Sequence, residues 1–171
     1  MGTETPTYGV SNRQKNEPAG ESGLMESRTS SIHIKTSVES AFDCVKNPAN
    51  FNDLMPGVAF RDIIMTPDGV GTRYRFETRV AGFTVRGTGE FTEVETNRRI
   101  HDETSIGVEG SFDWRFEPEG DGVRVTIEHH PGRHWGLPIV GRLLADSYER
   151  TDQQVLARLK AKLEADDSSR L

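Results

Sequence analysis

The sequence predicts an α+β fold in which one curved antiparallel sheet packs against a single long C-terminal helix. Six stretches between residues 58 and 128 alternate apolar and polar side chains with a period of two, as strands with one buried face do. Turn sequences such as Pro67-Asp68-Gly69 separate these stretches. From Pro138 onward, apolar residues recur at steps of three and four over about 27 residues, which predicts a helix roughly 40 Å long.

One strand and two short helices are expected before this series. Residues 30–35 alternate around two isoleucines and predict the first strand. Residues 36–39 (Thr-Ser-Val-Glu) have the spacing of a capping box, so a helix should begin there and continue through Val45. Pro48 ends this helix or opens a second short one that runs through Leu54.

The six later strands are expected to carry most of the aromatic rings on one face. Their predicted ranges are 58–65, 72–80, 83–94, 99–105, 111–116 and 123–128. Gly87 and Gly89 have the inner parity of the longest strand. Glycine at such positions favours sharp bending and leaves volume unfilled, so we expect a curved sheet with a hollow.

An internal cavity follows from the relative widths of the sheet and the helix. A helix about 10 Å wide cannot cover the inner face of a seven-stranded sheet. Uncovered rings would forfeit roughly 1.5–3 kcal/mol of burial each, so they must collapse onto the helix or surround a guest. The glycines and the number of rings favour a cavity over a collapsed core. The side chains expected to line it are Tyr74, Phe76, Thr78, Phe83, Val85, Phe91, Phe112, Trp114, Ile127, His129, Leu144 and Tyr148.

The composition of the chain predicts the limits of the folded domain, the location of the protein and the partners that it excludes. Residues 1–28 contain few apolar side chains and are expected to be a disordered tail, so the folded domain should span residues 29–166 and residues 167–171 should fray. There is no apolar run of the length that a secretory signal or a membrane span needs, which predicts a cytoplasmic location. The net charge of −6 argues against nucleic acid as a partner.

The single cysteine, Cys44, excludes an internal disulfide. It lies within an apolar helical pattern, which favours a buried small side chain over a reactive thiol.

The densest group of candidate polar residues is His129, His130 and His134. Neighbours on a strand point to opposite faces, so at most one of the first two can join His134, and we expect no metal ion and no cofactor. Strand parity places His129 at the mouth of the cavity, where it either bonds a ligand oxygen, acts as a base, or only bonds the backbone at the strand end. His129 and Tyr148 are the candidates for a catalytic acid or base.

Other polar residues weaken the prediction of catalysis. Five arginines have outward parity: Arg73, Arg75, Arg86, Arg115 and Arg124. His101 and Asp102 are adjacent in a strand whose parity the sequence leaves open. Because neighbouring strand residues diverge, we do not expect these two to form a general-base pair.

Several short motifs resemble a known superfamily. They are residues 32–34 (Ile-His-Ile), 37–42 (Ser-Val-Glu-Ser-Ala-Phe), 47–51 (Asn-Pro-Ala-Asn-Phe), 55–58 (Met-Pro-Gly-Val) and 71–74 (Gly-Thr-Arg-Tyr). With these motifs and its long last helix, the sequence from about residue 29 to residue 165 resembles the START-like, Bet v 1-like (SRPBCC) superfamily, in its bacterial polyketide cyclase/dehydrase and lipid transport branch. The tryptophan common in the second-helix segment of relatives is replaced here by Asn52-Asp53-Leu54.

The resemblance implies the helix-grip fold, with seven curved antiparallel strands, two short helices after the first strand and one long C-terminal helix. That superfamily contains carriers, cyclases, hormone receptors and ribosome-associated factors. We therefore expect binding or transport of a small hydrophobic ligand, lipid or polyketide-like, in an internal cavity. A polyketide cyclase/dehydrase-type enzyme and a regulatory or ribosome-associated interaction protein are the alternatives. The sequence leaves the ligand and the oligomeric state open.

Overall fold

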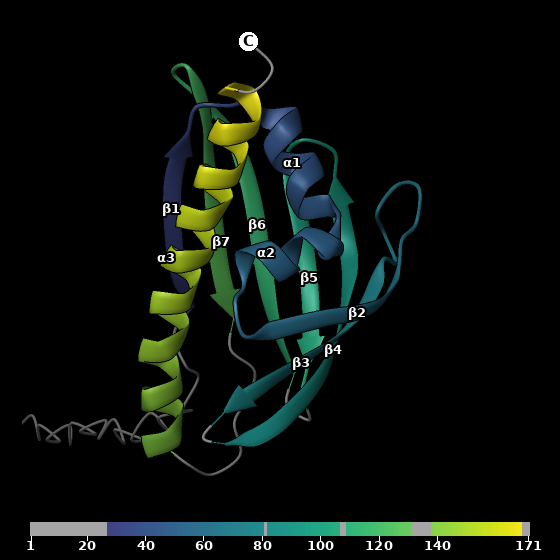
Figure 1. Cartoon of the computed structure of the whole chain (residues 1–171), viewed down its shortest axis with the longest axis vertical. Helices are drawn as coiled ribbons and strands as arrows, with labels where there is room; N and C mark the ends of the chain where they lie inside the picture. Colours follow the sequence, from purple (N-terminus) through teal and green to yellow (C-terminus); the bar gives the residue numbers. More distant parts are fainter. Residues whose placement is uncertain (1–26, 81, 107–108, 131–137, 169–171) are drawn as a thin grey trace, which may run out of the picture.

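The computed structural model describes residues 27–80, 82–106, 109–130 and 138–168, without the side chains of Val80 and of residues 138–150 and 167–168. One strand is followed by three short helical segments, six strands and a long helix (Figure 1). The elements are β1 (Arg28–Ile34), α1 (Val38–Lys46), η1 (Pro48–Asn50), α2 (Phe51–Leu54), β2 (Val58–Ile64), β3 (Arg73–Val80), β4 (Phe83–Glu95), β5 (Arg99–Ser105), β6 (Glu109–Glu119), β7 (Gly122–His130) and α3 (Pro138–Ser168). The predicted fold class is confirmed.

Several expectations fall on residues that are not described. These are most of the predicted tail, the C-terminal residues 169–171, the loop that contains His134, and the side chains of Leu144 and Tyr148. They stay predictions.

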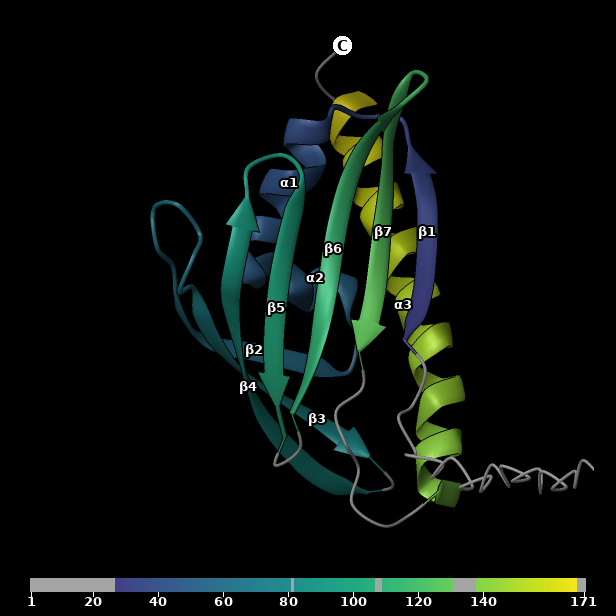
Figure 2. The same cartoon turned by 180° about the vertical axis from the view of Figure 1, so that it is seen from behind.

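All seven strands form one antiparallel sheet in the order β1-β7-β6-β5-β4-β3-β2. The sheet curves strongly, so that β2 and β3 cross the direction of β5 to β7 (Figures 1 and 2). The predicted hairpin between β6 and β7 is confirmed: Glu119 pairs with Gly122, and Gly120 supplies a positive φ of 57° in the two-residue turn.

The helix α1 starts where the sequence predicts, but its cap differs from the expected one. The Ser37 Oγ accepts a hydrogen bond from the amide of Ser40 at 3.1 Å, while the Thr36 hydroxyl is buried with no hydrogen-bond partner. Ser37 caps because it is the last residue with extended backbone before the helical turn. The prediction that Cys44 is buried is confirmed.

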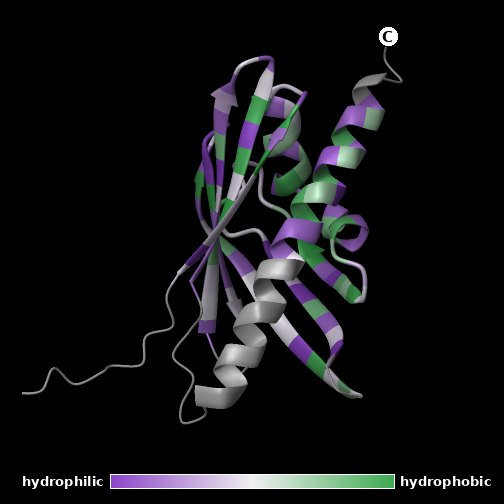
Figure 3. Ribbon diagram, turned by 90° about the vertical axis from the view of Figure 1, so that its left-hand side faces the viewer, coloured by the Kyte–Doolittle hydropathy of each residue, from purple (hydrophilic) through white to green (hydrophobic). Residues whose placement is uncertain are grey.

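The C-terminal helix lies along the β1 side of the sheet (Figure 1). Three of its leucines are buried: Leu156, Leu159 and Leu163. The Lys160 Nζ donates a hydrogen bond to the carbonyl of His33 at 2.9 Å, and a Glu164 carboxylate oxygen accepts one from the amide of Lys35 at 3.1 Å. These bonds tie the helix to the end of β1. Figure 3 shows the alternating hydropathy of the strands that face this helix.

The short helix α2 supplies the ring at the centre of the core. Phe51 stacks on Trp114, with ring centroids 6.0 Å apart, and meets Phe60, Tyr74 and Phe91 edge to face. The comparison of widths made from the sequence considered only the long C-terminal helix, whereas α2 covers the rings of Tyr74, Phe91 and Trp114.

A side chain on α2 fixes this arrangement. The Asn52 carboxamide accepts a hydrogen bond from the amide of Phe60 at 2.9 Å and donates one to the carbonyl of the same residue at 3.3 Å. Asn52 thereby joins α2 to β2, and Phe51 is held against the sheet.

Candidate ligand-binding site

The two inner-face glycines of β4 lie beneath aromatic rings of β3. A Cβ at Gly89 would collide with the ring of Tyr74, and one at Gly87 would collide with the ring of Phe76. The expectation that these glycines leave volume unfilled is therefore wrong, because the rings of the paired strand lie over them. The sheet is curved as predicted, and the missing side chains let β3 rings reach across β4.

The ring of Tyr74 lies over Gly89, so its hydroxyl reaches β5, the strand beyond β4. Its hydroxyl donates a hydrogen bond of 2.5 Å to Oδ2 of Asp102 on β5. Asp102 is 3% exposed and lies between Phe91 and Phe112 in the strand register. A carboxyl group thus stands on the inner, aromatic face of the sheet.

Burial controls the ionisation of this pair. Desolvation raises the pKa of Asp102 to about 8, against a lowering by the Tyr74 hydrogen bond and a further rise from the charge of Glu103. The pKa of Tyr74 lies well above its usual value, through desolvation and the adjacent carboxyl. At neutral pH Asp102 is therefore a neutral acid. Its second oxygen, Oδ1, is buried with no hydrogen-bond partner.

His129 lies on the same inner face, as predicted. Phe112 pairs with Asp102 on one side and with His129 on the other. The His129 ring is 5% exposed and stacks on Phe112, with ring centroids 4.3 Å apart. The row Asp102, Phe112, His129 places two ionisable groups on either side of one aromatic ring.

Besides the buried Tyr74 and His129, the predicted cavity residues with described side chains differ in exposure. Phe91, Trp114 and Ile127 are fully packed in the core. Phe76, Thr78, Val85 and Phe112 are partly exposed, and Phe83, at the end of the β3–β4 hairpin, is 76% exposed. As ligand contacts, all of these residues stay predictions, together with Leu144 and Tyr148.

Asp102 is the site residue that sequence reasoning missed. One signal could have found it: Ile100 is the single apolar side chain of its strand, and Asp102 lies two residues further, on the same face. The parity could not be carried over from β4, because the β4–β5 register shifts between Phe91 and Glu93.

The opposite face of the sheet is charged. Asp113, 4% exposed, accepts a hydrogen bond from the Arg99 Nε at 2.5 Å and contacts His101 and His130 at 3.2 and 3.3 Å. Desolvation raises the pKa of Asp113, but the hydrogen bonds from Arg99 and His101 outweigh it and lower that pKa overall. Of the five arginines predicted to point outward, four are exposed and Arg124 is half-buried.

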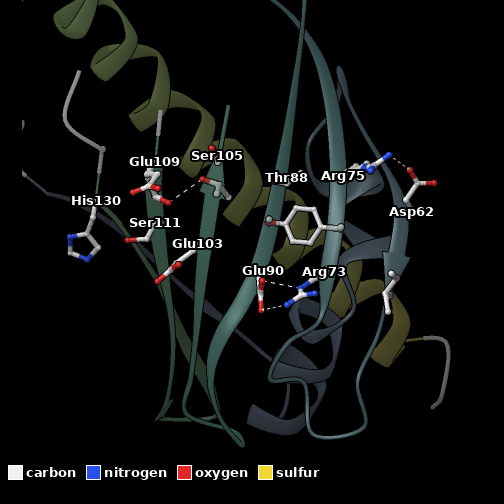
Figure 4. Close-up of a pocket in the computed structure, with 15 residues that line it drawn as sticks. Asp62, Arg73, Arg75, Thr88, Glu90, Glu103, Ser105, Glu109, Ser111 and His130 are labelled. Carbon is white, nitrogen blue, oxygen red and sulfur yellow. Dashed lines mark hydrogen bonds and ion pairs between the residues drawn. The ribbon is translucent and has the colours of Figure 1, made fainter. Parts of the chain in front are cut away.

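A hollow of about 890 Å³ opens on this charged face, bordered by residues of β2 to β7. Figure 4 shows its paired charges: Arg73 contacts Glu90, and Arg75 contacts Asp62. Both ion pairs are exposed, and within each pair the two opposite charges compensate each other. Most residues that line the hollow are charged or polar, whereas a site for a hydrophobic guest is lined mainly by apolar side chains.

Within the described ranges, no three His, Cys, Asp or Glu side chains are grouped so that they could hold a metal ion. The described helices include none that is long and apolar enough to cross a membrane.

A match to a known protein family agrees with the fold described above. Residues 25–164 match the family described as polyketide cyclase / dehydrase and lipid transport. The chain belongs to this family. No curated protein matches the chain in sequence.

Solved structures of similar fold cover nearly the whole domain. The Zhui aromatase/cyclase of a Streptomyces species matches with a TM-score of 0.66 at 15% identity, over 81% of this chain and 93% of that one. Ara h 8.0201 matches with a TM-score of 0.62 at 14% identity, over 82% and 98%. A protein of Thermus thermophilus matches with a TM-score of 0.62 at 20% identity, also over 82% and 98%. At these identities the likeness shows the shared helix-grip fold.

Proposed function

We propose that this family member binds a small hydrophobic molecule on the inner face of its sheet, beside the packed aromatic core. The observation that carries the proposal is the uneven cover of that face. The helix α3 follows β1, and α2 covers the centre, but the lower part of β3 and β4 has no helix over it (Figure 1). Phe76 of β3, Val85 of β4 and Phe112 of β6 are partly exposed.

Partly exposed rings on a concave wall favour an apolar guest. Each ring that a ligand covers adds roughly 25 cal/mol for every Å² of apolar surface removed from water. The family description, which includes lipid transport, supports the same class of ligand. Asp102 and His129 border Phe112 and can supply the few polar contacts that orient a bound molecule.

Binding is tested with an apolar fluorescent dye. Its fluorescence is expected to rise on mixing with the wild-type protein, and Phe112→Ala is expected to weaken the dye's affinity about fivefold or more, because a ring of the wall is lost. The matched control is Ile64→Ala, which removes an exposed apolar side chain from β2. Equal affinities in all three proteins, or no signal with the wild type, would contradict the proposal.

Catalysis of the cyclase or dehydrase type is a second candidate. One observation favours it: Asp102, held neutral by burial and bonded to Tyr74, is a potential proton donor beside the wall. Mass spectrometry of the bound molecule after incubation distinguishes the two functions. A carrier returns its ligand unchanged, whereas an enzyme returns a molecule with one water fewer or with a new ring.

A further inference from the structure

The outer face of the sheet has no described helix packed against it. The described helices all lie on the opposite, inner face (Figures 1 and 2). On the outer face, carboxylates of successive strands are paired with arginines. These pairs are Asp62–Arg75, Glu77–Arg86, Glu90–Arg73, Glu93–Arg99 and Glu128–Arg115. A face made of such pairs attracts a charged partner only where one charge is left over.

Two carboxylates are left over, and both border the outer hollow of about 890 Å³. They are Glu103 of β5 and Glu109 of β6, and both side chains are exposed. Among the described residues, Glu103 has one neighbour that can carry a positive charge, His101 at 3.9 Å, and Glu109 has none within ion-pair distance. His130 also borders the hollow, but it contacts Asp113 and Glu128 instead.

The strand register places these two carboxylates at opposite corners of a square. Glu103 pairs with Ser111, and Ser105 pairs with Glu109, so all four side chains share the outer face. Diagonal neighbours on two antiparallel strands lie about 7–8 Å apart. Figure 4 shows the four side chains together on one side of the hollow. The square therefore presents a carboxylate at two corners and a hydroxyl at the other two.

Short side chains between longer ones explain why the face is hollowed here. Thr88 of β4 pairs with Ser105, so a row of short hydroxyl side chains forms the floor of the hollow. Longer side chains border it, among them Arg73, Glu90 and the two unpaired glutamates. On the β2 side it is bordered by Ile64, an apolar side chain that is 65% exposed.

We propose that the outer hollow is a docking site for a partner protein, which inserts an exposed arginine side chain between Glu103 and Glu109. A guanidinium carries five N–H donors in a planar fork, so it can bond two carboxylates and a hydroxyl at once, whereas a lysine ammonium acts as a point charge. A protein segment matches the hollow better than a free cation does, because Ile64 on the same rim can cover an apolar residue of that segment. This inference is independent of ligand binding on the inner face.

The test uses a capped peptide, acetyl-Leu-Gly-Arg-Gly-Leu-amide, and the same peptide with citrulline in place of arginine. Citrulline has nearly the same shape and no charge. In ¹⁵N–¹H spectra of the full chain, the amide signals of residues 103, 105, 109 and 111 are expected to move with the arginine peptide and to stay in place with the citrulline peptide. Raising the NaCl concentration from about 50 mM to about 500 mM is expected to weaken binding, because salt screens exposed charges.

A substitution in the hollow is compared with a matched one outside it. Glu109→Gln is expected to weaken binding of the arginine peptide about fivefold, because a charge-assisted hydrogen bond is lost. Glu117→Gln removes the same charge from an exposed position on the same face of β6, outside the hollow, and is expected to change the affinity less than about twofold. Both variants should bind the apolar dye as the wild type does.

Four results would overturn the inference. The arginine peptide may leave all four signals in place, or the citrulline peptide may bind equally well. Glu117→Gln could weaken binding as much as Glu109→Gln, which would show attraction to the net charge alone. Finally, methylguanidinium could bind as tightly as the arginine peptide, in which case the hollow takes a free cation and no protein segment.

Discussion

Asp102 is a single residue whose ionisation couples the wall of the site to the stability of the domain. Its pKa is about 8 in the folded protein against an ordinary value of 3.8. Below about pH 4 both the folded and the unfolded chain hold the proton, so the group has no effect on stability. Between about pH 4 and pH 8 only the unfolded chain releases it, so the free energy of unfolding falls by about 1.4 kcal/mol per pH unit. Above pH 8 the effect is constant.

The first stability prediction uses the amide replacement. Asp102→Asn cannot ionise, so its free energy of unfolding at pH 7.5 is expected to exceed that of the wild type by about 2 kcal/mol or more. The difference is expected to shrink as the pH is lowered to 4.5, measured by urea unfolding at a series of pH values. A difference that does not vary with pH would show that Asp102 is ionised in the folded protein.

At the scale of elements, the important feature of strand β4 is that two of its inner-face residues are glycines. Gly87 and Gly89 have no side chains, so Phe76 and Tyr74 of β3 lie flat across the strand. The Tyr74 ring packs against Phe51 in the aromatic core, and the Tyr74 hydroxyl reaches Asp102 on β5. The same two glycines therefore serve both the packing of the core and the placement of the Tyr74–Asp102 pair.

The second stability prediction tests the contact between Gly89 and the Tyr74 ring. Gly89→Ala is expected to destabilise the protein by about 1–3 kcal/mol, because its Cβ collides with the Tyr74 ring. In a Tyr74→Ala background the same change should cost at least about 1 kcal/mol less, as a double-mutant cycle in urea would measure. Thr88→Ala, on the exposed face of the same strand, is the control and should change stability by less than about 0.5 kcal/mol. Additive effects would contradict the contact.

At the scale of the whole molecule, three helical elements share the inner face of one sheet. The helix α3 packs along β1 at one edge, and α1 packs over β6 and β7. The helix α2 packs against β2 at the other edge, and its Phe51 reaches rings of β3, β4 and β6. This division leaves part of β3 and β4 without a helix over it (Figure 1). Phe76 of β3 and Phe112 of β6 are the partly exposed rings of the inner face. The proposed binding region is therefore a consequence of where the helices dock.

The third stability prediction tests whether α3 belongs to the same cooperative unit as the sheet. Leu159 is fully buried, so Leu159→Ala is expected to cost about 2–5 kcal/mol. Circular dichroism and tryptophan fluorescence should still report one coincident transition, at a lower denaturant concentration. Arg158→Ala, at the exposed neighbour, should have little effect. Two separate transitions would mean that the helix unfolds independently.

The sequence alone determined the order of elements, the face of most strands and the inner position of His129. These features depend on local periodicity, in which an apolar side chain at every second position fixes a strand's buried face. The helix start at residue 38 and the turn at Gly120 are likewise local, because capping and positive φ depend on a few consecutive residues.

How these elements meet depends on contacts between distant parts of the chain. The register of β5 against β4, shifted near Phe91, set Asp102 on the inner wall beside Phe112. The docking of α2, held by Asn52, placed Phe51 over rings that had been expected to stay uncovered. Such contacts join residues far apart in the chain, and their geometry depends on the sheet's curvature. The glycines of β4 indicated that the sheet bends but not which side chains the bend brings together, so the polar group at the centre of the candidate site emerged only once the strands were paired.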